Sequence, residues 1–394
     1  MKQNRVFLAG AVRTPIGKFG GILAGLTAVD LAVVAAREAL KRTGIPPEKV
    51  DGVIFGHARQ AGCGPNPGRQ IAFRAGVPVE KPAYTVNQAC GSSLRAIFNA
   101  CQEILMGNAE IILVGGTESM SNTPYMLPQA RWGYRMGHSD LVDGMYKDGF
   151  LCPLSNLVMG ETAENLARKY GITREEQDRF AVMSQNRYEE ARKAGRFQDE
   201  MVPVETTQKG KTLVVDKDEH PRDGATLEGL AKLPPVFSKD GTVHAGNSSG
   251  ITDGASAMVV LSEKAALEMN LKPMAAIVDY TICGVDPSIM GIGPVPAIRK
   301  LQDRTGVSLD EIPLIEMNEA FAAQVIACLR EIPIPLERVN VNGGAIALGH
   351  PIGCTGARIV TTLLHEMGRR KASRGMATLC ISGGMGMALL LEAT

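Results

Sequence analysis

The stretch KRTGIPPEKVDGVIFGHA, residues 41–58, returns in altered form as DRTGVSLDEIPLIEMNEA, residues 303–320. The copies share an Arg-Thr-Gly tripeptide and the spacing of their apolar residues, and they lie 262 positions apart (303 − 41). At the same offset Gly91 meets Gly353, each in a turn before a helical pattern. Strands that alternate with helices favour parallel sheets with helices on both faces. The sequence therefore predicts two related α/β halves.

The repeat also predicts the domain organisation. Residues 1–121 form the first half, which a segment near 251–270 completes, and residues 271–394 form the second half. Residues 122–250 have no counterpart in the second half, and we interpret them as an inserted loop or lid domain over one edge. Sites in open α/β sheets lie beyond the carboxyl ends of the strands, so we expect the functional residues at that edge.

Composition narrows the class of protein. Of the 394 residues, 45% are hydrophobic and 21% charged, and the net charge is +1 without a long basic run. We therefore expect no nucleic-acid partner, and no stretch reaches the roughly 18 apolar residues of a membrane span. The N-terminal residues favour a first strand over a secretory signal. The eight cysteines form no CxxC pair and the six histidines lack metal spacing, which predicts free thiols, a cytoplasmic location and no metal site.

A lone cysteine stands in the turn of VNQACGSSLRAI, residues 86–97. A β-prone AYTV precedes the turn, and a helical spacing that ends near Gly107 follows it. Cys90 should then lie at or just before a helix N-terminus, where free N–H groups and the helix dipole favour an anion. We expect its thiol to lose its proton readily and to act as a nucleophile. The alternative is a small, inert cysteine of the core.

Three more polar residues follow strand-like runs. Asn318 precedes a helix, His350 lies in a Gly-rich turn that the repeat pairs with the Cys90 turn, and Cys380 ends a strand before a glycine turn. Two thiols, an imidazole and an amide can perform acyl transfer, with attack on a carbonyl, oxyanion stabilisation and proton transfer. Each residue also has a structural interpretation: Asn318 as an N-cap, His350 as a turn residue and Cys380 as a core residue.

These segments together resemble the thiolase family over essentially the whole chain. NVNGGAIALGHPIGCTGAR resembles a highly specific thiolase signature, NQACGSSLRAI the nucleophile motif, and NEAFA and CISGGMG the other two active-site loops. HAGNSSGITDGASA resembles the family's coenzyme A segment. The resemblance implies a duplicated fold of two α/β halves with mixed sheets, layered α-β-α-β-α, with an inserted loop domain. It implies an acyltransferase that cleaves 3-oxoacyl-CoA with CoA, or runs the reverse Claisen condensation, by ping-pong chemistry.

The resemblance also implies roles for single residues. Cys90 becomes the acylated nucleophile, Cys380 the acid/base near the substrate α-carbon, and His350 and Asn318 serve oxyanion sites. In this scheme Asn318 acts through a water, and His350 also activates Cys90. Implied substrate contacts are Ser249 with the pantetheine arm, Arg222 with the nucleotide end, Met159 and Phe237 in the pocket walls, and Ala320, Phe321, Ser382 and Gly383 in the active-site loops.

The same resemblance sets expectations for cofactors and partners. We expect no tightly bound cofactor, with CoA and acyl-CoA as substrates, a homo-oligomer (dimer or homotetramer) and a place in fatty acid metabolism. Chain length, physiological direction and pathway do not follow from the residues.

Four positions depart from the family pattern. Ser382 stands where the family commonly has glycine, and Ser93 stands where acetoacetyl-CoA thiolases usually have glycine. Val158 replaces a histidine common in that subgroup, which weakens the case for strict short-chain specificity. Gly229 replaces a serine that usually contacts coenzyme A there.

Other functions are less compatible with the sequence. A decarboxylating condensing enzyme of related fold typically lacks the second cysteine loop, which Cys380 supplies here. A catalytically silent acyl-CoA-binding subunit should have lost Cys90 or His350, and both are present. A dinucleotide-binding oxidoreductase should show GxGxxG opening a helix after the first strand, and the sequence has none.

Overall fold

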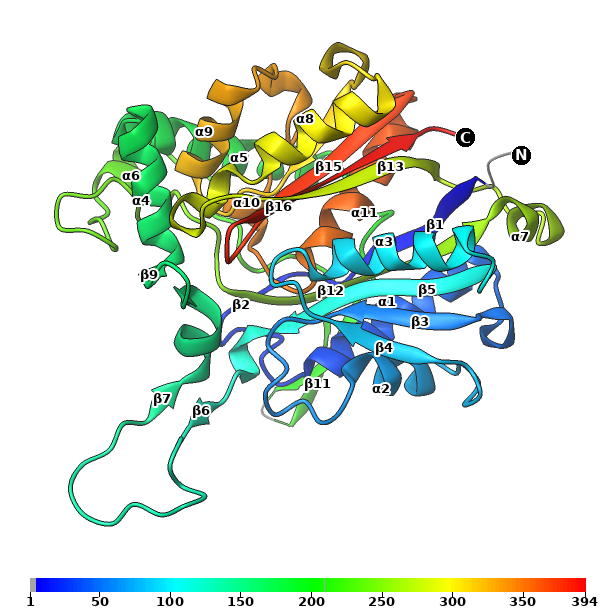
Figure 1. Ribbon diagram of the computed structural model, residues 1–394, viewed down its shortest axis with the longest axis horizontal. Helices are drawn as coiled ribbons and strands as arrows, with labels where there is room; N and C mark the ends of the chain where they lie inside the picture. Colours follow the sequence, from blue (N-terminus) through cyan, green and yellow to red (C-terminus); the bar gives the residue numbers. More distant parts are fainter. Residues whose placement is uncertain (1–4, 209) are drawn as a thin grey trace.

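The computed structural model describes residues 5–208 and 210–394. Its main body consists of alternating layers in the order helix, sheet, helix, sheet, helix (Figure 1). The outer helices on one side are α1 (Ala28–Thr43) and α2 (Pro67–Arg74), the central ones are α3 (Ser92–Leu105) and α11 (Thr355–Arg370), and those on the other side are α8 (Pro294–Thr305) and α9 (Ala322–Glu331).

The first half contributes a mixed sheet with the strand order β4-β3-β5-β12-β1. Strand β3 pairs in parallel with β4 and β5, whereas β12 runs antiparallel to β5 and to β1. The prediction of parallel strands therefore holds for only part of this sheet. Strand β12 is antiparallel because the chain returns from the insertion at the edge where β5 ends. The strands are β1 (Val6–Arg13), β3 (Gly52–Gly56), β4 (Ala83–Val86), β5 (Ile111–Ser119) and β12 (Thr252–Ser262), with the short β2 (Gly17–Lys18) paired to β12.

The second half repeats this plan with the order β14-β15-β16-β13. Strands β14 and β15 are parallel, and β16 is antiparallel to both β15 and β13. The two sheets join where Val6, Phe7 and Leu8 of β1 pair with residues 275–277 of β13. The strands are β13 (Ala275–Gly284), β14 (Leu314–Met317), β15 (Arg374–Ile381) and β16 (Met385–Glu392).

The structure confirms the internal repeat. Short 3-10 helices at Pro47–Lys49 and Leu309–Glu311 begin 262 positions apart (309 − 47), and β3 and β14 begin at the same offset (314 − 52). Gly44 and Gly306 both end the preceding helix in the left-handed conformation, with φ of 66° and 71°. The turn before α3 is therefore equivalent to the turn before α11.

The central helices α3 and α11 meet at their N-terminal ends. They share one apolar cluster with strands of both sheets. A Cβ added to Gly356 would lie 2.5 Å from the backbone nitrogen of Leu94, and one added to Gly116 would lie 2.2 Å from the carbonyl oxygen of Gly353. Such approaches exclude any side chain. The turns that carry Cys90 and His350 are thereby brought to one place.

The segment between β5 and β12 packs over the edge that these turns form. Its helix α4 contacts α9, and α5 contacts the short α10. Residues 127–141 form a long loop that extends away from the body (Figure 1). The elements of the segment between β5 and β12 are β6 (Tyr125–Met126), β7 (Val142–Asp143), a π-helix (Tyr146–Phe150), β8 (Leu151–Cys152), β9 (Leu157–Val158), α4 (Met159–Tyr170), α5 (Arg174–Lys193), β10 (Val204–Gln208), β11 (Lys211–Val215) and α6 (Leu227–Ala231).

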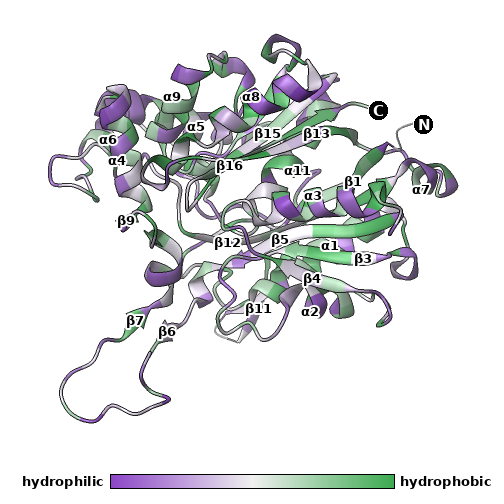
Figure 2. Cartoon of the chain, in the orientation of Figure 1, coloured by the Kyte–Doolittle hydropathy of each residue, from purple (hydrophilic) through white to green (hydrophobic). Residues whose placement is uncertain are grey.

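Apolar residues concentrate in the strands, whereas polar residues predominate on the outer helices and the long loop (Figure 2). Within the part of the chain that the structure describes, no helix is both long enough and apolar enough to cross a membrane. The remaining elements are α7 (Glu263–Glu268), α10 (Ala345–Leu348) and 3-10 helices at Met120–Asn122, Pro287–Ile292 and Leu336–Arg338.

Candidate active site

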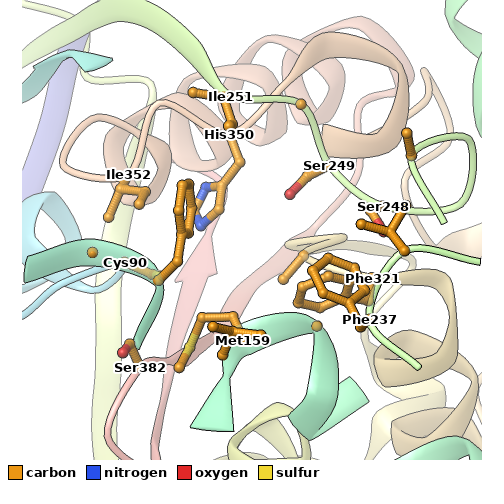
Figure 3. Close-up of a pocket in the computed structure, with 18 of the residues that line it drawn as sticks. Cys90, Met159, Phe237, Ser248, Ser249, Ile251, Phe321, His350, Ile352 and Ser382 are labelled. Atoms are coloured by element: carbon orange, nitrogen blue, oxygen red, sulfur yellow. The ribbon is translucent and has the colours of Figure 1, made fainter. Parts of the chain in front are cut away.

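A cavity of about 640 Å³ lies where the two halves and the insertion meet. Figure 3 shows Cys90 and Ser382 at one end of the cavity, with Ser248 and Phe321 toward the other. Three of the residues that the sequence predicts for the site, Asn318, Cys380 and Gly383, do not line it. Those that do line it are Cys90, Met159, Arg222, Phe237, Ser249, Ala320, Phe321, His350 and Ser382.

Cys90 lies where the sequence predicts, in the turn between β4 and α3. Ala89 has a φ of 45°, a conformation rare for residues other than glycine, and Gly91 is the N-cap of α3. Cys90 is buried in a small apolar cluster with Ala58, Met120, Met145 and Ile352. Burial raises the pKa of Cys90, although the backbone N–H of Ser382 lowers it. The expectation of a readily ionised thiol is therefore wrong, because loss of hydration outweighs the two backbone N–H groups and the charge of Arg59.

The imidazole of His350 has a defined orientation and lines the cavity. The hydroxyl of Thr355 donates to the carbonyl oxygen of Pro351 at 3.1 Å, so it accepts from Nδ1–H of His350 at 2.6 Å. This arrangement places the ring proton on Nδ1. The buried Nε2 has no hydrogen-bond partner among the described residues. Burial and the charges of Arg358 and Arg59 lower the pKa of His350 to about 3, so the imidazole is neutral near pH 7.

Asn318 is completely buried behind the cavity wall. Its backbone N–H donates to the carbonyl oxygen of Thr378 at 3.0 Å, which fixes the residue to the interior of β15. Both atoms of its side-chain amide lack a partner in the part of the chain that the structure describes. Buried polar groups of this kind are usually satisfied by an ordered water. The residue is not the N-cap of α9, a position that Phe321 occupies.

Cys380 is fully buried near the end of β15, opposite Gly386 of β16. Burial raises the pKa of Cys380 well above its ordinary value, and negative charge at Cys90 raises it further. The two thiols are close enough to interact, so ionisation of one disfavours ionisation of the other.

A tight turn joins β15 to β16 beside these thiols. Gly383 and Gly384 have φ of 89° and 85°, which require glycine, but Ser382 is not among the residues with positive φ. The serine is therefore compatible with the turn, and its backbone N–H remains near Cys90.

The far end of the cavity is built from the insertion and the segment before β12. The N–H of Ser249 donates to the carbonyl oxygen of Ala320 at 3.0 Å. Phe237 and Phe321 pack edge to face with ring centroids 6.3 Å apart. Arg222 lines the cavity beside His220, whose Nδ1 lies 2.7 Å from the carbonyl oxygen of Ala347.

The other departures from the family pattern also have defined surroundings. Ser93 Oγ accepts the N–H of Ala357 at 2.9 Å, so this hydroxyl joins the N-terminal ends of α3 and α11. Val158 lines the cavity immediately before α4. Gly229 lies in α6 and is not part of the cavity lining.

Several residues of the site were not found from the sequence. His57 and Glu118 form a buried pair with 3.1 Å between Nε2 and Oε1, and Arg59 lines the cavity near Cys90. Thr355 and His220 were also missed. The one available signal was polarity: Glu118 follows the apolar run IILVGG, and Arg59 follows a buried strand. In residues 5–208 and 210–394, no group of three histidine, cysteine or acidic side chains could hold a metal ion.

Comparisons with known proteins agree over the full chain. Family models described as "Thiolase, N-terminal domain" and "Thiolase, C-terminal domain" match residues 6–264 and 271–393. The chain is 52% identical to an acetyl-CoA acetyltransferase of Syntrophomonas wolfei over 394 residues, covering 99% of each chain. It is also 52% identical to an acetyl-CoA acetyltransferase of Pseudomonas aeruginosa over 387 residues, covering 98% of each.

Solved structures give the same result. A crystal structure of the Bacillus anthracis acetyl-CoA acetyltransferase matches with a TM-score of 0.98 and 47% identity, covering 100% of this chain and 99% of that one. Human mitochondrial 3-ketoacyl-CoA thiolase in complex with CoA matches with a TM-score of 0.96 and 45% identity, covering 100% of this chain and 98% of that one.

Proposed function

This chain belongs to the thiolase family, and we propose from that premise how its own residues carry out acyl transfer between acyl-CoA and CoA. In the degradative direction a 3-oxoacyl-CoA is cleaved to acetyl-CoA and a shortened acyl-CoA. In the reverse direction two acyl thioesters undergo Claisen condensation. Both directions pass through a thioester on Cys90, so the kinetics are ping-pong.

The observation that carries this proposal is the Nε2 of neutral His350, which has no partner among residues 5–208 and 210–394 and belongs to a residue of the cavity that Cys90 also lines. Because burial keeps Cys90 as a thiol, it needs a base when it attacks the C3 carbonyl of the substrate. His350 takes that proton at Nε2. The backbone N–H of Ser382 and that of Cys90 itself lie at the sulfur and are available to developing negative charge.

Cleavage of the C2–C3 bond then leaves the chain on Cys90 and produces the enolate of acetyl-CoA. The Cys380 thiol gives its proton to the enolate carbon, and its raised pKa suits this donor role. A water held by the free amide of Asn318 and the protonated His350 stabilise the enolate oxygen. In the second half-reaction CoA gives its thiol proton to the Cys380 thiolate and attacks the thioester. His350 returns its proton to Cys90.

Coenzyme A and acyl-CoA are the proposed substrates, and a relative of the same fold has been solved with CoA. We propose that Ser249 contacts the pantetheine arm and Arg222 the nucleotide end, at the end of the cavity away from Cys90. The remaining proposed contacts are Met159 and Phe237 in the walls, and Ala320, Phe321, Ser382 and Gly383 in the loops.

We also propose the organisation and setting of the enzyme. Residues 1–121 and 271–394 act as related halves, with residues 122–250 as a lid domain. The enzyme works as a homo-oligomer, a dimer or tetramer, in the cytoplasm and in fatty acid metabolism. The loop of residues 127–141 supports association, because it exposes Trp132 and Met136 at 84% and 97%.

The acyl-enzyme intermediate provides the direct test. The protein is incubated with acetyl-CoA, quenched in acid and digested, and the peptides are analysed by mass spectrometry. We expect a thioester-labile acetyl group on the Cys90 peptide. It should disappear in Cys90→Ala and persist in Cys283→Ala, which removes a cysteine outside the cavity. A label confined to any other cysteine contradicts the proposal.

The alternative functions are weakened by the same cavity. A decarboxylating condensing enzyme does not require a second thiol such as Cys380 near Cys90. A catalytically silent binding subunit does not require a histidine whose Nε2 lacks a partner among the described residues. Decarboxylation of malonyl-CoA without thiolysis of acetoacetyl-CoA would favour the first alternative.

A further inference from the structure

Among the residues that the structure describes, no side chain forms an ion pair with the buried guanidinium of Arg59. The residue is 7% exposed and lines the cavity. Its buried Nε has no partner, and no hydrogen bond or ion pair of the described residues involves the guanidinium. Arginines are almost never buried without a partner. In the same chain Arg13 is buried against two carboxylates, with Glu200 at 2.6 Å and Asp218 at 2.7 Å.

The nearest buried carboxylate does not fill this role. Glu118 Oε1 lies 3.1 Å from His57 Nε2 and accepts the backbone N–H of Arg59 at 3.0 Å. Its Oε2 accepts the N–H groups of Ala58 at 3.2 Å and Gly353 at 2.8 Å. Burial opposes a charge on His57, but the neighbouring Glu118 carboxylate outweighs it and raises the pKa of His57 to about 9. Glu118 is therefore already bound by His57 and by three backbone N–H groups, and in the described part of the chain it forms no ion pair with the Arg59 guanidinium.

The position of Arg59 places it at the acyl end of the cavity. It follows β3 and Cys90 follows β4, and these neighbouring parallel strands lie about 4.8 Å apart. Arg222 and Ser249, the proposed CoA contacts, belong to other segments. The guanidinium is held against Gly149 of the π-helix, where an added Cβ would lie 2.6 to 2.9 Å from its atoms. Tyr146 and Phe150 of the same helix supply apolar walls.

We propose that Arg59 forms a subsite for a carboxylate at the far end of the acyl chain, so that the preferred substrates are 3-oxoacyl-CoA thioesters of dicarboxylic acids. A guanidinium binds a carboxylate through two parallel hydrogen bonds, and partial burial strengthens them. The apolar walls contact the methylene groups between the thioester and the carboxylate. This substrate class rests on the proposed thiolase function and specifies it further.

The bonds that form and break are the same as in thiolysis of any other 3-oxoacyl-CoA. Cys90 attacks the C3 carbonyl, the C2–C3 bond breaks, and acetyl-CoA leaves with a proton from Cys380. The chain that remains on Cys90 ends in a carboxylate beside Arg59. The CoA thiol then gives its proton to the Cys380 thiolate and attacks the thioester. The bond to Cys90 breaks, and the chain leaves as a dicarboxylic acyl-CoA. The carboxylate is bound throughout and undergoes no chemistry.

Substrates that are matched in length isolate the contribution of the terminal charge. Thiolysis is measured with the 3-oxoacyl-CoA pair of six carbons, 3-oxoadipyl-CoA and 3-oxohexanoyl-CoA, and with the corresponding pair of eight carbons. We expect the wild-type protein to have a higher kcat/KM for the dicarboxylic member of at least one pair. In Arg59→Met the ratio of dicarboxylic to methyl-ended kcat/KM should fall about ten- to a hundredfold, the range for a charged hydrogen bond. Arg59→Lys should retain part of the ratio.

The control variant is Arg179→Met, which removes an arginine from an exposed ion pair with Glu175 on α5 and should leave the ratio unchanged. A wild-type preference for the methyl-ended member of both pairs overturns the proposal. An equal loss for both members in Arg59→Met also overturns it, because it assigns Arg59 to Cys90 rather than to the chain end. Absence of thiolysis with every substrate, acetoacetyl-CoA included, is a different result and contradicts the thiolase function itself.

Discussion

Replacement of Thr355 by valine tests how the tautomer of His350, the proposed base, is selected. The Thr355 hydroxyl accepts from Nδ1–H of His350 at 2.6 Å, which leaves Nε2 free of a proton. In Thr355→Val the Nδ1–H is buried without an acceptor. The ring can escape this penalty by moving its proton to Nε2, but that tautomer cannot accept the proton of Cys90.

The size of the effect follows from this geometry. An unsatisfied buried donor costs about 1–3 kcal/mol, and this cost shifts the tautomer equilibrium against the active form. Because each 1.4 kcal/mol is a factor of ten, kcat/KM should fall about five- to 150-fold. The loss should appear in both kcat/KM and the rate of Cys90 acylation, since both require the base.

The assay is initial-rate thiolysis of acetoacetyl-CoA at pH 7, with the rate of acyl-enzyme formation and the melting temperature measured on the same samples. Thr355→Ser keeps the hydroxyl and should stay within about threefold of wild type, a difference near 0.6 kcal/mol. If Thr355→Val keeps the wild-type kcat/KM while it remains folded, Thr355 does not select the tautomer and the reasoning is refuted.

Three further predictions follow from the site. Cys380→Ser should keep part of the acetyl transfer to Cys90 but abolish the exchange of acetyl methyl hydrogens with deuterium, followed by NMR; exchange at the parent rate would assign the carbon base elsewhere. The apolar wall at Val158 should accept chains longer than acetoacetyl, with about 1–3 kcal/mol of discrimination per methylene; a strict four-carbon preference that Val158→His leaves unchanged would contradict this. The folded pKa of His350, about 3, lies below the usual 6.5, so the unfolded state binds the proton first and the free energy of unfolding should decrease as pH falls from 6.5 toward 3. In chemical denaturation at several pH values, His350→Asn should lessen that decrease, and an identical pH dependence in wild type and variant would contradict the assignment.

The layout of the fold could be predicted because the repeat and the helical spacing can be recognised directly in the sequence. Helical spacing after Cys90 and the 262-residue offset placed the turns of Cys90 and His350 at equivalent positions, as the structure has them. The antiparallel direction of β12 could not be predicted from the sequence, since it depends on where the insertion returns to the sheet.

The chemical state of the site could not be obtained in the same way. A helix N-terminus is visible in the sequence, but burial raises the pKa of Cys90, and the apolar cluster that contains Cys90 brings together Met120, Met145 and Ile352 from separate segments. That no described residue forms an ion pair with Arg59 likewise depends on which groups Glu118 already binds. Such properties arise from contacts between distant parts of the chain.

The shared central layer has a consequence for how the protein is made. During synthesis α3 emerges early, yet the helix that covers it, α11, comes only with residues 355–370. Until then the apolar face that α3 presents to α11 lacks its native cover, and such surface promotes aggregation. His350 and Cys380 also lie in this late part of the chain. A ribosome-bound nascent chain that stops before α11 should therefore recruit chaperones. It should also lack acyl-transfer activity, even if the turn that carries Cys90 has already folded.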